Sequence, residues 1–415
     1  MAKATTAAPA VIPGVIPGDD PSKIPLVPIS LPKAEMHIHI GLALSHEVFL
    51  RRIQKGRTPI KADFLINRSL RYYDDLAQHH ATYEQMRHIT STPGELAQVT
   101  QDYLERIARE GAIYAELSSS YRDANTFDAM TDAIEEGIHC ARANTGIEAR
   151  IVVTAIRNFG AAQAEAAARH LAKRRRPLVT GFGMAAEENL DQFGDYSKAL
   201  HIAWHEAGLG LAPHVAEQYV HNAVDFLGAI PKEALRVHAD DPRRLRAGHA
   251  TLIHLSSDLM QQFAEYQICI ETCLSANKRI NLPEHTRAHH LGEKIMTAAG
   301  RSVTLDKPLR TYFKNLWQHP LKEYVAAGIP VCLGSDNPLL QNTNIGKENS
   351  LAMKARLTDL NGALQMTENA IKFANVDMMT RLALMQKVDL YRTSVRAGTP
   401  PTATAFGYKR AFDTI

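Results

Sequence analysis

The residues best suited to chemistry in this chain are histidines and carboxylates that follow short apolar runs. His37 and His39 end the first run, and alternate side chains of a strand share one face, so both imidazoles point the same way. His214, His249 and Asp336 end three later runs. Three of these four imidazoles with the one carboxylate, and one position left open for water, would form a ligand set typical of a catalytic zinc site. Such a site lowers the pKa of bound water, which is hydrolase chemistry.

Each of these residues alone has an ordinary structural explanation, such as a loop cap, a buried core histidine or a turn aspartate before proline. Together they lack a common packing reason, because polar side chains end four different apolar runs. Glu217 follows His214 by three residues, so its carboxyl group is close enough on the chain to share the same site. The combination therefore favours a functional site over separate structural roles.

The elements that must position these residues follow a repeating pattern of apolar strands and amphipathic helices. The expected strands span residues 34–40, 112–117, 149–156, 178–184, 209–214, 245–249, 267–271 and 330–334. The expected helices between them include residues 95–110, 127–144, 161–175, 196–207 and 320–327. Continuous apolar strands alternating with helices indicate a parallel sheet, and eight such units predict a closed (β/α)8 barrel. An open doubly wound sheet is the alternative, but no Gly-x-Gly-x-x-Gly follows the first strand.

The pattern predicts a mobile N-terminal arm over residues 1–30 and a single barrel domain over residues 31–415. Two long segments interrupt the barrel: a helical lid insertion after the first strand, residues 46–83, and a polar segment, residues 281–318. Long segments at this end of a barrel usually cover the active site. The sequence pattern of residues 351–397 predicts extra C-terminal helices after the barrel. The pairs His79-His80 and His289-His290 are expected at the surface.

The composition is ordinary for a globular protein: 45% of residues are hydrophobic and 22% are charged, which excludes a fully disordered chain. A formal net charge of +3 is too small to favour a nucleic-acid or anionic-membrane partner. Four cysteines among 415 residues do not make a disulfide framework, so we expect reduced thiols in a cytoplasmic protein. The longest uncharged stretch, residues 4–18, contains three prolines and predicts neither a spanning helix nor a signal peptide.

Several motifs in chain order resemble those of the adenosine deaminase family. They are LPKAEMHIH (31–39), GFGMAAEE (181–188), HVAE (214–217), GH (248–249), ETCLSAN (271–277), HPL (319–321) and SDNP (335–338). The family consists of zinc hydrolases on a (β/α)8 barrel that replace the 6-amino group of a purine with oxygen. The resemblance implies one Zn²⁺ per chain, and the implied ligands are His37, His39, His214 and Asp336.

The same resemblance implies roles for three further residues. Glu217 would lie beside purine N1 and protonate it, which removes the cost of making the C=N bond single. His249 would orient the attacking water and assist its deprotonation. The backbone amide of Ala186 would meet the purine. General acid catalysis of this kind contributes about 10²- to 10⁴-fold in rate.

Two substrate-binding positions depart from the family pattern. The family usually follows its His-x-His with Leu-Asp-Gly, whose aspartate contacts the ribose, but Gly41 occupies that position here. We expect Gly41 to leave open space beside the sugar. The family's second closing aspartate, which meets purine N7, is Asn337, whose amide can still donate a hydrogen bond.

The function expected from these observations is zinc-dependent deamination of adenosine or a related 6-aminopurine, with that small molecule as the partner. One alternative is a hydrolase that acts on a different amino-heterocycle at the same zinc site. The other, from a different class, is a binding protein with a vestigial deaminase site. The complete set of ligand and catalytic residues argues against the second alternative.

Overall fold

The computed structural model describes residues 30–54, 56, 72–189, 192–236, 240–297, 299–312 and 315–397. Except for Ser30, the predicted arm over residues 1–30 lies outside this described part, as do residues 55 and 57–71 of the predicted lid. The start of a single domain at residue 31 stays a prediction.

Eight parallel runs of strand form the barrel predicted from the apolar pattern, within the residues that the structure describes. They are β1 (Lys33–His39), β2 (Ala112–Tyr121), β3 (Glu148–Ile156), β4 (Val179–Ala185), β5 (Gly210–Leu211) continued by β6 (His214–Val215), β7 (Arg246–His249), β8 (Cys269–Thr272) and β11 (Val331–Leu333). The pairing runs β1-β2-β3-β4-β5 in one sheet and β6-β7-β8-β11 in the other. Bridges from Leu211 to Leu245 and from Ile38 to Asp336 join the edges of the two sheets.

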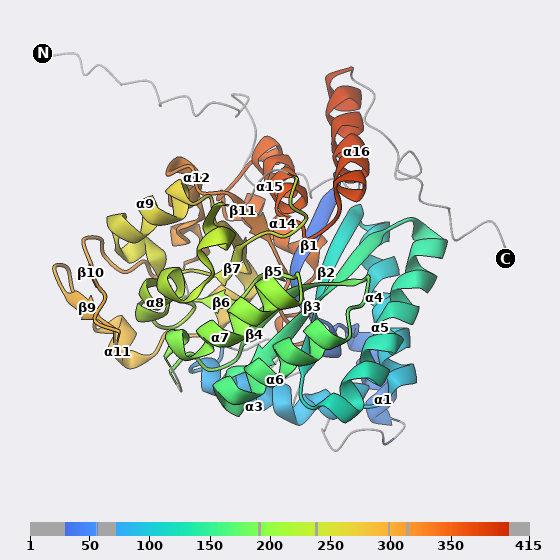
Figure 1. Ribbon diagram of the computed structural model, residues 1–415. Coiled ribbons are helices and arrows are strands. Elements are labelled where there is room, and N and C mark those ends of the chain that lie inside the picture. The colour runs from blue at the N-terminus through green and yellow to red at the C-terminus, as the bar shows by residue number, and fades with distance from the viewer. Residues whose placement is uncertain are drawn as a thin grey trace, which may run out of the picture.

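Helices surround the strands (Figure 1). Those between or after the strands are α4 (Pro93–Arg109), α5 (Ala124–Thr145), α6 (Gly160–Lys173), α7 (Ser197–His201), α8 (His221–Ala229), α9 (Ser257–Glu265), α12 (Leu321–Ala326), α14 (Ile345–Lys354), α15 (Leu360–Lys372) and α16 (Met378–Arg396). α14, α15 and α16 are the extra C-terminal helices, and α16 stands out from the rest of the molecule in Figure 1.

Local sequence explains why these elements begin and end where they do. Eight of the nine residues of β3 are buried, as expected for a strand covered on both faces. α4 begins with a capping box between Thr92 and Glu95. Gly208 and Gly328 adopt φ values of 71° and 76° just after helical segments, as their predicted C-cap roles require.

The two long segments, residues 46–83 and 281–318, contain different secondary structure. The first contains α1 (His46–Gln54) and α3 (Leu76–Met86). The second contains α11 (Glu284–Arg287) and a hairpin of β9 (Lys294–Met296) and β10 (Ser302–Thr304); α10 (Leu274–Arg279) precedes it and α13 (Pro338–Gln341) follows β11. Pairing between Tyr73 and Ile280 fixes the start of α3 against the end of α10.

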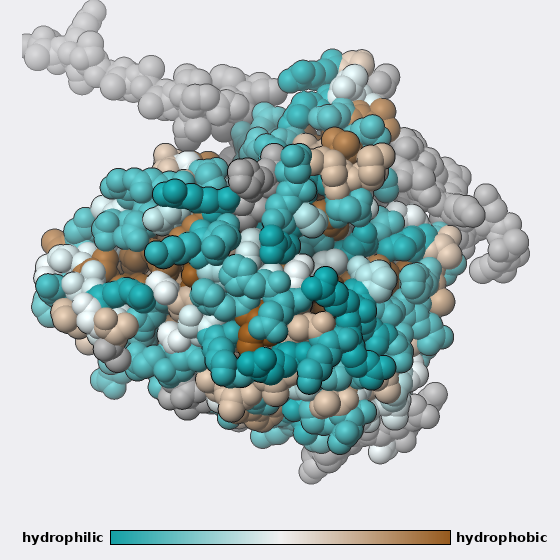
Figure 2. Space-filling model, in the orientation of Figure 1, coloured by the Kyte–Doolittle hydropathy of each residue, from teal (hydrophilic) through white to brown (hydrophobic). Residues whose placement is uncertain are grey.

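The visible face of the molecule is mostly hydrophilic, with apolar residues in small patches (Figure 2). Such scattered apolar surface is normal for globular proteins. Among the described residues, no helix combines the length and the apolar character that a membrane crossing requires.

A fully buried ion cluster lies among the strands. Arg246 on β7 contacts Glu116 on β2 and Glu271 on β8, each at 2.5 Å between nitrogen and oxygen. Its third contact is the carbonyl oxygen of Phe373, at 2.7 Å. Burial alone would raise the pKa of Glu271, but the charge of Arg246 holds it below the usual carboxyl range. The cluster therefore keeps a carboxylate ionised where water does not reach it.

We predict that Arg246→Met lowers the free energy of unfolding by about 3–5 kcal/mol, because it leaves two buried carboxylates without their cation. Chemical denaturation of the variant and the parent measures this difference. As a control, Arg51→Met removes an exposed pair with Glu47 and should cost less than about 1 kcal/mol. An equal effect of both variants would show that the buried cluster contributes no special stability.

Candidate active site

Histidine and aspartate side chains meet at the carboxyl ends of the strands. Ligand atoms of His37, His214, His249 and Asp336 all lie within 4.8 Å of one another, and all four residues are buried. His39 joins them, since its Nε2 lies 3.3 Å from Asp336 Oδ1 and 3.4 Å from His214 Nε2. Five possible donors thus converge, and the sequence predicted all of them to lie at strand ends.

His37 shows that this cluster fits a cation. Its Nδ1 donates to Glu271 Oε2 at 2.7 Å, so in the neutral ring the lone pair is on Nε2. That atom faces His214 Nε2 at 3.1 Å and Asp336 Oδ1 at 3.9 Å. Two imidazole nitrogens and a carboxylate oxygen grouped in this way are donors that a divalent metal ion can take.

Two glycines make room for His37. A Cβ at Gly334 would lie 2.3 Å from His37 Cβ, and a Cβ at Gly248 would lie 2.8 Å from its ring. No side chain fits at either position, so the backbones of β7 and of the turn after β11 can approach β1 closely. The position of the first histidine therefore depends on glycines in two other segments.

Left-handed backbone conformations concentrate around the cluster. Ala186, Ala216, His249, Ala250 and Asp336 have φ values between 47° and 75°. These conformations are unfavourable for residues with a Cβ and are retained where the surrounding structure over-determines them, often at functional sites. Here they turn the chain sharply at strand ends and direct side chains toward the cluster.

Glu217 lies next to His249 and lines the same pocket, with 3.6 Å between Glu217 Oε2 and His249 Nε2. Its backbone is fixed by Glu188, whose carboxylate accepts hydrogen bonds from the amides of Glu217, Gln218 and Tyr219. Burial raises the pKa of the Glu217 carboxyl well above its usual range; Asp336 and Glu188 add to the rise, and Arg157 opposes it. The environment therefore favours a protonated carboxyl group.

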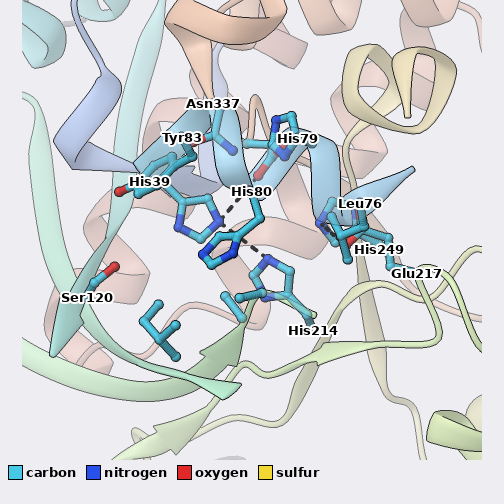
Figure 3. Close-up of a pocket in the computed structure, with 14 residues that line it drawn as sticks. His39, Leu76, His79, His80, Tyr83, Ser120, His214, Glu217, His249 and Asn337 are labelled. Atoms are coloured by element: carbon cyan, nitrogen blue, oxygen red, sulfur yellow. Dashed lines mark hydrogen bonds and ion pairs between the residues drawn. The ribbon is translucent and has the colours of Figure 1, made fainter. Parts of the chain in front are cut away.

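A pocket opens beside the cluster (Figure 3). His39, His214, Glu217, His249, Asp336, Ala186 and Asn337 line it, as predicted for substrate-contacting or metal-binding residues. Ile156 and Ala185 add apolar walls from the ends of β3 and β4. α3 contributes Leu76, His79, His80 and Tyr83. The lid predicted after the first strand therefore covers the site, whereas no pocket-lining residue in the described part comes from residues 281–318.

Two expectations about this region are wrong. Gly41 does not leave open space: a Cβ there would lie 3.1 Å from the hydroxyl oxygen of Tyr83, and Gly41 does not line the pocket. His79 is buried rather than at the surface, and both it and His80 face the pocket. The sequence missed this because two adjacent polar histidines in a weakly amphipathic helix give no signal of burial. Of the other pair, His290 is exposed as expected and His289 is partly buried.

Three residues of the recognised motifs had no predicted role and lie just behind the site. Glu271 holds His37, as described above. Asn277 contacts His249 and His319. Only their places in the motifs ETCLSAN and HPL could have pointed to them, because their partners are distant in sequence.

Comparison with known proteins identifies the class to which this fold and cluster belong. A family model described as adenosine deaminase matches residues 32–311 and 308–391. An adenine deaminase of Mesorhizobium japonicum is 31% identical over 362 residues, covering 86% of this chain and 98% of that protein. An adenine deaminase of Chelativorans is also 31% identical, over 361 residues, covering 86% of this chain and 97% of that protein.

Solved structures agree on the fold. The crystal structure of an Arthrobacter aurescens adenine deaminase has a TM-score of 0.67 at 19% identity, covering 87% of this chain and 99% of that chain. A zinc-bound amidohydrolase from Burkholderia ambifaria has a TM-score of 0.63 at 20% identity, covering 89% of this chain and 93% of that chain. The barrel therefore shares its fold with these structures. The chain belongs to the adenosine deaminase family, whose members are hydrolytic deaminases.

We predict that Gly334→Ala lowers metal content and activity by about 10- to 100-fold, since the new methyl group must displace His37. Elemental analysis of the purified variant measures the metal. Gly328→Ala is the matched control: its Cβ would meet nothing within 4 Å, but its φ of 76° is strained. That control should lose about 1 kcal/mol of stability while it keeps its metal. Full metal content in Gly334→Ala would mean that the glycine is not needed for the site.

Proposed function

We propose that this protein catalyses the zinc-dependent hydrolytic deamination of a 6-aminopurine, with the free base adenine as its substrate. The observation that carries the proposal is one pocket that joins a metal-binding cluster, the buried carboxyl group of Glu217 and the carboxamide of Asn337. The similarity to adenine deaminases over nearly their whole length supports the choice of base.

The residues present fit a zinc ion. We assign His37, His39, His214 and Asp336 as its ligands, one ion per chain, because imidazole and carboxylate are donors that zinc prefers. When bound, the ion would supply an activated water molecule at neutral pH. The hydrogen bond from His37 Nδ1 to Glu271 fixes the ring orientation that this ligation needs.

Glu217 supplies the acid. Addition of water oxygen to C6 forms a C–O bond and pushes the electron pair of the C6=N1 bond onto N1, where the proton of Glu217 is transferred. The C6–N6 bond then breaks, and the amino group leaves as ammonia with one proton of the attacking water. The other water proton returns Glu217 to its acid form, and C6 becomes a carbonyl. Water and adenine thus give hypoxanthine and ammonia. His249, 3.6 Å from the carboxyl group, orients the attacking oxygen.

Asn337 and Ala186 bind the rest of the purine. The Asn337 side-chain oxygen is buried and has no partner among the described residues, so it is available to a ligand N–H. Its amide can donate to a ring nitrogen as well. The free base carries a movable proton on its five-membered ring, and a carboxamide can pair with either form. Ala186, which lines the pocket in a left-handed conformation, would offer its backbone amide.

The packing of α3 beside Gly41 supports the base rather than the nucleoside. Tyr83 takes the space beside Gly41 that a ribose contact would need, and its hydroxyl is hydrogen-bonded to Ser120. The other contacts of α3 reinforce this closure: His80 lies 3.7 Å from Glu187, and His79 accepts from Gln341 at 3.0 Å.

We also propose a cytoplasmic enzyme that works on its small-molecule substrate without nucleic acid or membrane. The cysteines are free, and three of the four are buried. Free thiols are usual in the reducing cytoplasm.

For the acid, we predict that Glu217→Gln keeps zinc and fold but lowers kcat by about 10²- to 10⁴-fold, because an amide cannot deliver the N1 proton. Loss of adenine absorbance over time gives kcat, and elemental analysis gives zinc. Glu293→Gln, in the segment that does not line the pocket, should change neither. A loss below tenfold in the first variant would contradict the proposed acid.

For the substrate, we predict that the parent enzyme prefers adenine to adenosine and to its 5′-phosphate by about 100-fold or more in kcat/KM, equivalent to about 2.7 kcal/mol. Tyr83→Ala should open the sugar side and raise kcat/KM for adenosine by tenfold or more. Tyr83→Phe keeps the bulk and is the matched control, for which adenosine should remain poor. Preference of the parent for adenosine would reject the free base as substrate.

A further inference from the structure

The distances alone leave the role of His249 undecided. Its ring nitrogen lies within the same 4.8 Å group as His37, His214 and Asp336, which would make it a metal ligand, and it also lies 3.6 Å from Glu217. A neutral imidazole binds a metal only through the nitrogen that carries no proton. The position of the ring proton therefore decides whether His249 is a ligand or a hydrogen-bond donor.

A chain of hydrogen bonds behind the site determines that position. It starts at the backbone amide of Leu321, which can only donate and which reaches His319 Nδ1 at 3.2 Å. His319 Nδ1 is therefore an acceptor, and the proton of the neutral ring is on Nε2. Burial lowers the pKa of His319 to about 3, so the ring is neutral at physiological pH.

The second hydrogen bond determines the orientation of the Asn277 side-chain amide. His319 Nε2 lies 3.3 Å from Asn277 Oδ1, which accepts the proton of the imidazole. The carbonyl end of the Asn277 side chain is thereby assigned, and the NH₂ end faces the other way. Asn277 and His319 are only 4% and 3% exposed, so water does not compete for these bonds.

The third bond reaches the site. Asn277 Nδ2 lies 3.1 Å from His249 Nδ1, and an amide NH₂ can only donate. His249 Nδ1 is therefore an acceptor, and the proton of this neutral ring is on Nε2, the atom that faces Glu217. His37 is arranged in the opposite way, because a carboxylate accepts from its Nδ1 and leaves Nε2 free to bind a metal.

We propose that Asn277 and His319 are positioning residues that hold the His249 proton on Nε2, which keeps His249 out of the metal ligand set and presents an N–H to the attacking oxygen. The proposal rests on the proposed deamination for its catalytic consequence. His249 then orients that oxygen as a donor and does not take its proton. Neither positioning residue touches the purine, so each affects turnover through His249 rather than through binding.

The decisive variant is Asn277→Asp. A carboxylate of the same shape still accepts from His319 but no longer donates to His249, so His249 Nδ1 must become the proton donor. We expect kcat to fall by about 100-fold, as for loss of one preorganised donor, with KM for adenine changed less than threefold. Asn369→Asp is the matched control: it also replaces a side-chain amide that donates a hydrogen bond, in this case to the backbone carbonyl of Val331, but it lies away from the site. Its kcat should be unchanged.

Variants of His319 test the start of the chain. His319→Gln keeps an N–H donor toward Asn277 and an acceptor for Leu321, so kcat should stay within about fivefold. His319→Leu removes both functions, and kcat should fall by about tenfold or more at similar KM. Loss of activity in the glutamine variant equal to that in the leucine variant would indicate a packing role and would overturn the proposal.

A spectroscopic readout on the zinc-loaded parent enzyme does not depend on activity. With ¹⁵N-labelled histidine, two-bond ¹H–¹⁵N correlation spectra show which ring nitrogen carries the proton, and His249→Gln identifies the His249 signals. We expect a proton on Nε2 in the parent and on Nδ1 in Asn277→Asp. A proton on Nδ1, or metal ligation by His249, in the parent would overturn the proposal. If the spectra agree but adenine is not deaminated, the proposed substrate fails and the positioning role stands.

Discussion

The hydrogen bond from His37 Nδ1 to Glu271 is the interaction on which most of the site depends. It is buried, and its acceptor stays ionised because Arg246 lies beside it. Arg246 in turn contacts Glu116 on the far side of the barrel. The orientation of the first metal-binding histidine therefore depends on the balance of buried charges in the core. A substitution in the ion cluster is therefore expected to affect the site through the orientation of the His37 imidazole.

The histidines of the site illustrate how identical side chains acquire different roles. A carboxylate behind His37 and an amide behind His249 place the ring protons at opposite positions, although both rings point into the same cluster. By distance alone, His249 belongs with the possible ligands as much as His39 does. The partners behind each ring separate the roles more sharply than the positions of the rings do, because protonation decides which nitrogen has a lone pair to share.

Much of this arrangement could be predicted from the sequence, and the physical reasons for the successes and failures differ. Buried parallel strands have continuous apolar runs, so the barrel strands and the polar residues that end them are visible locally. The fifth strand is interrupted between Leu211 and His214, where Pro213 has no amide hydrogen to donate; that break was not predicted. Tyr83 beside Gly41, and Asn277 behind His249, depend on the approach of segments that are distant along the chain. The periodicity of apolar residues along the chain carries no information on such contacts. The polar character of His79 and His80 led to the wrong expectation that both lie at the surface.

The fastening of α3 has a consequence for the timing of the reaction. The helix is held by polar contacts to the ends of β2 and β4 and to α13: Arg122 with Glu84, Glu187 with His80, and Gln341 with His79. The helix lines the pocket, so we expect a base bound beneath it to pass these contacts on entry and release, and α3 would then act as a kinetic gate. Entry of the substrate and release of the bulky product would then share one step, the opening of α3. Ammonia is small enough to leave without that step. The contacts that would have to open are one ion pair, between Arg122 and Glu84, and two contacts made by His79 and His80.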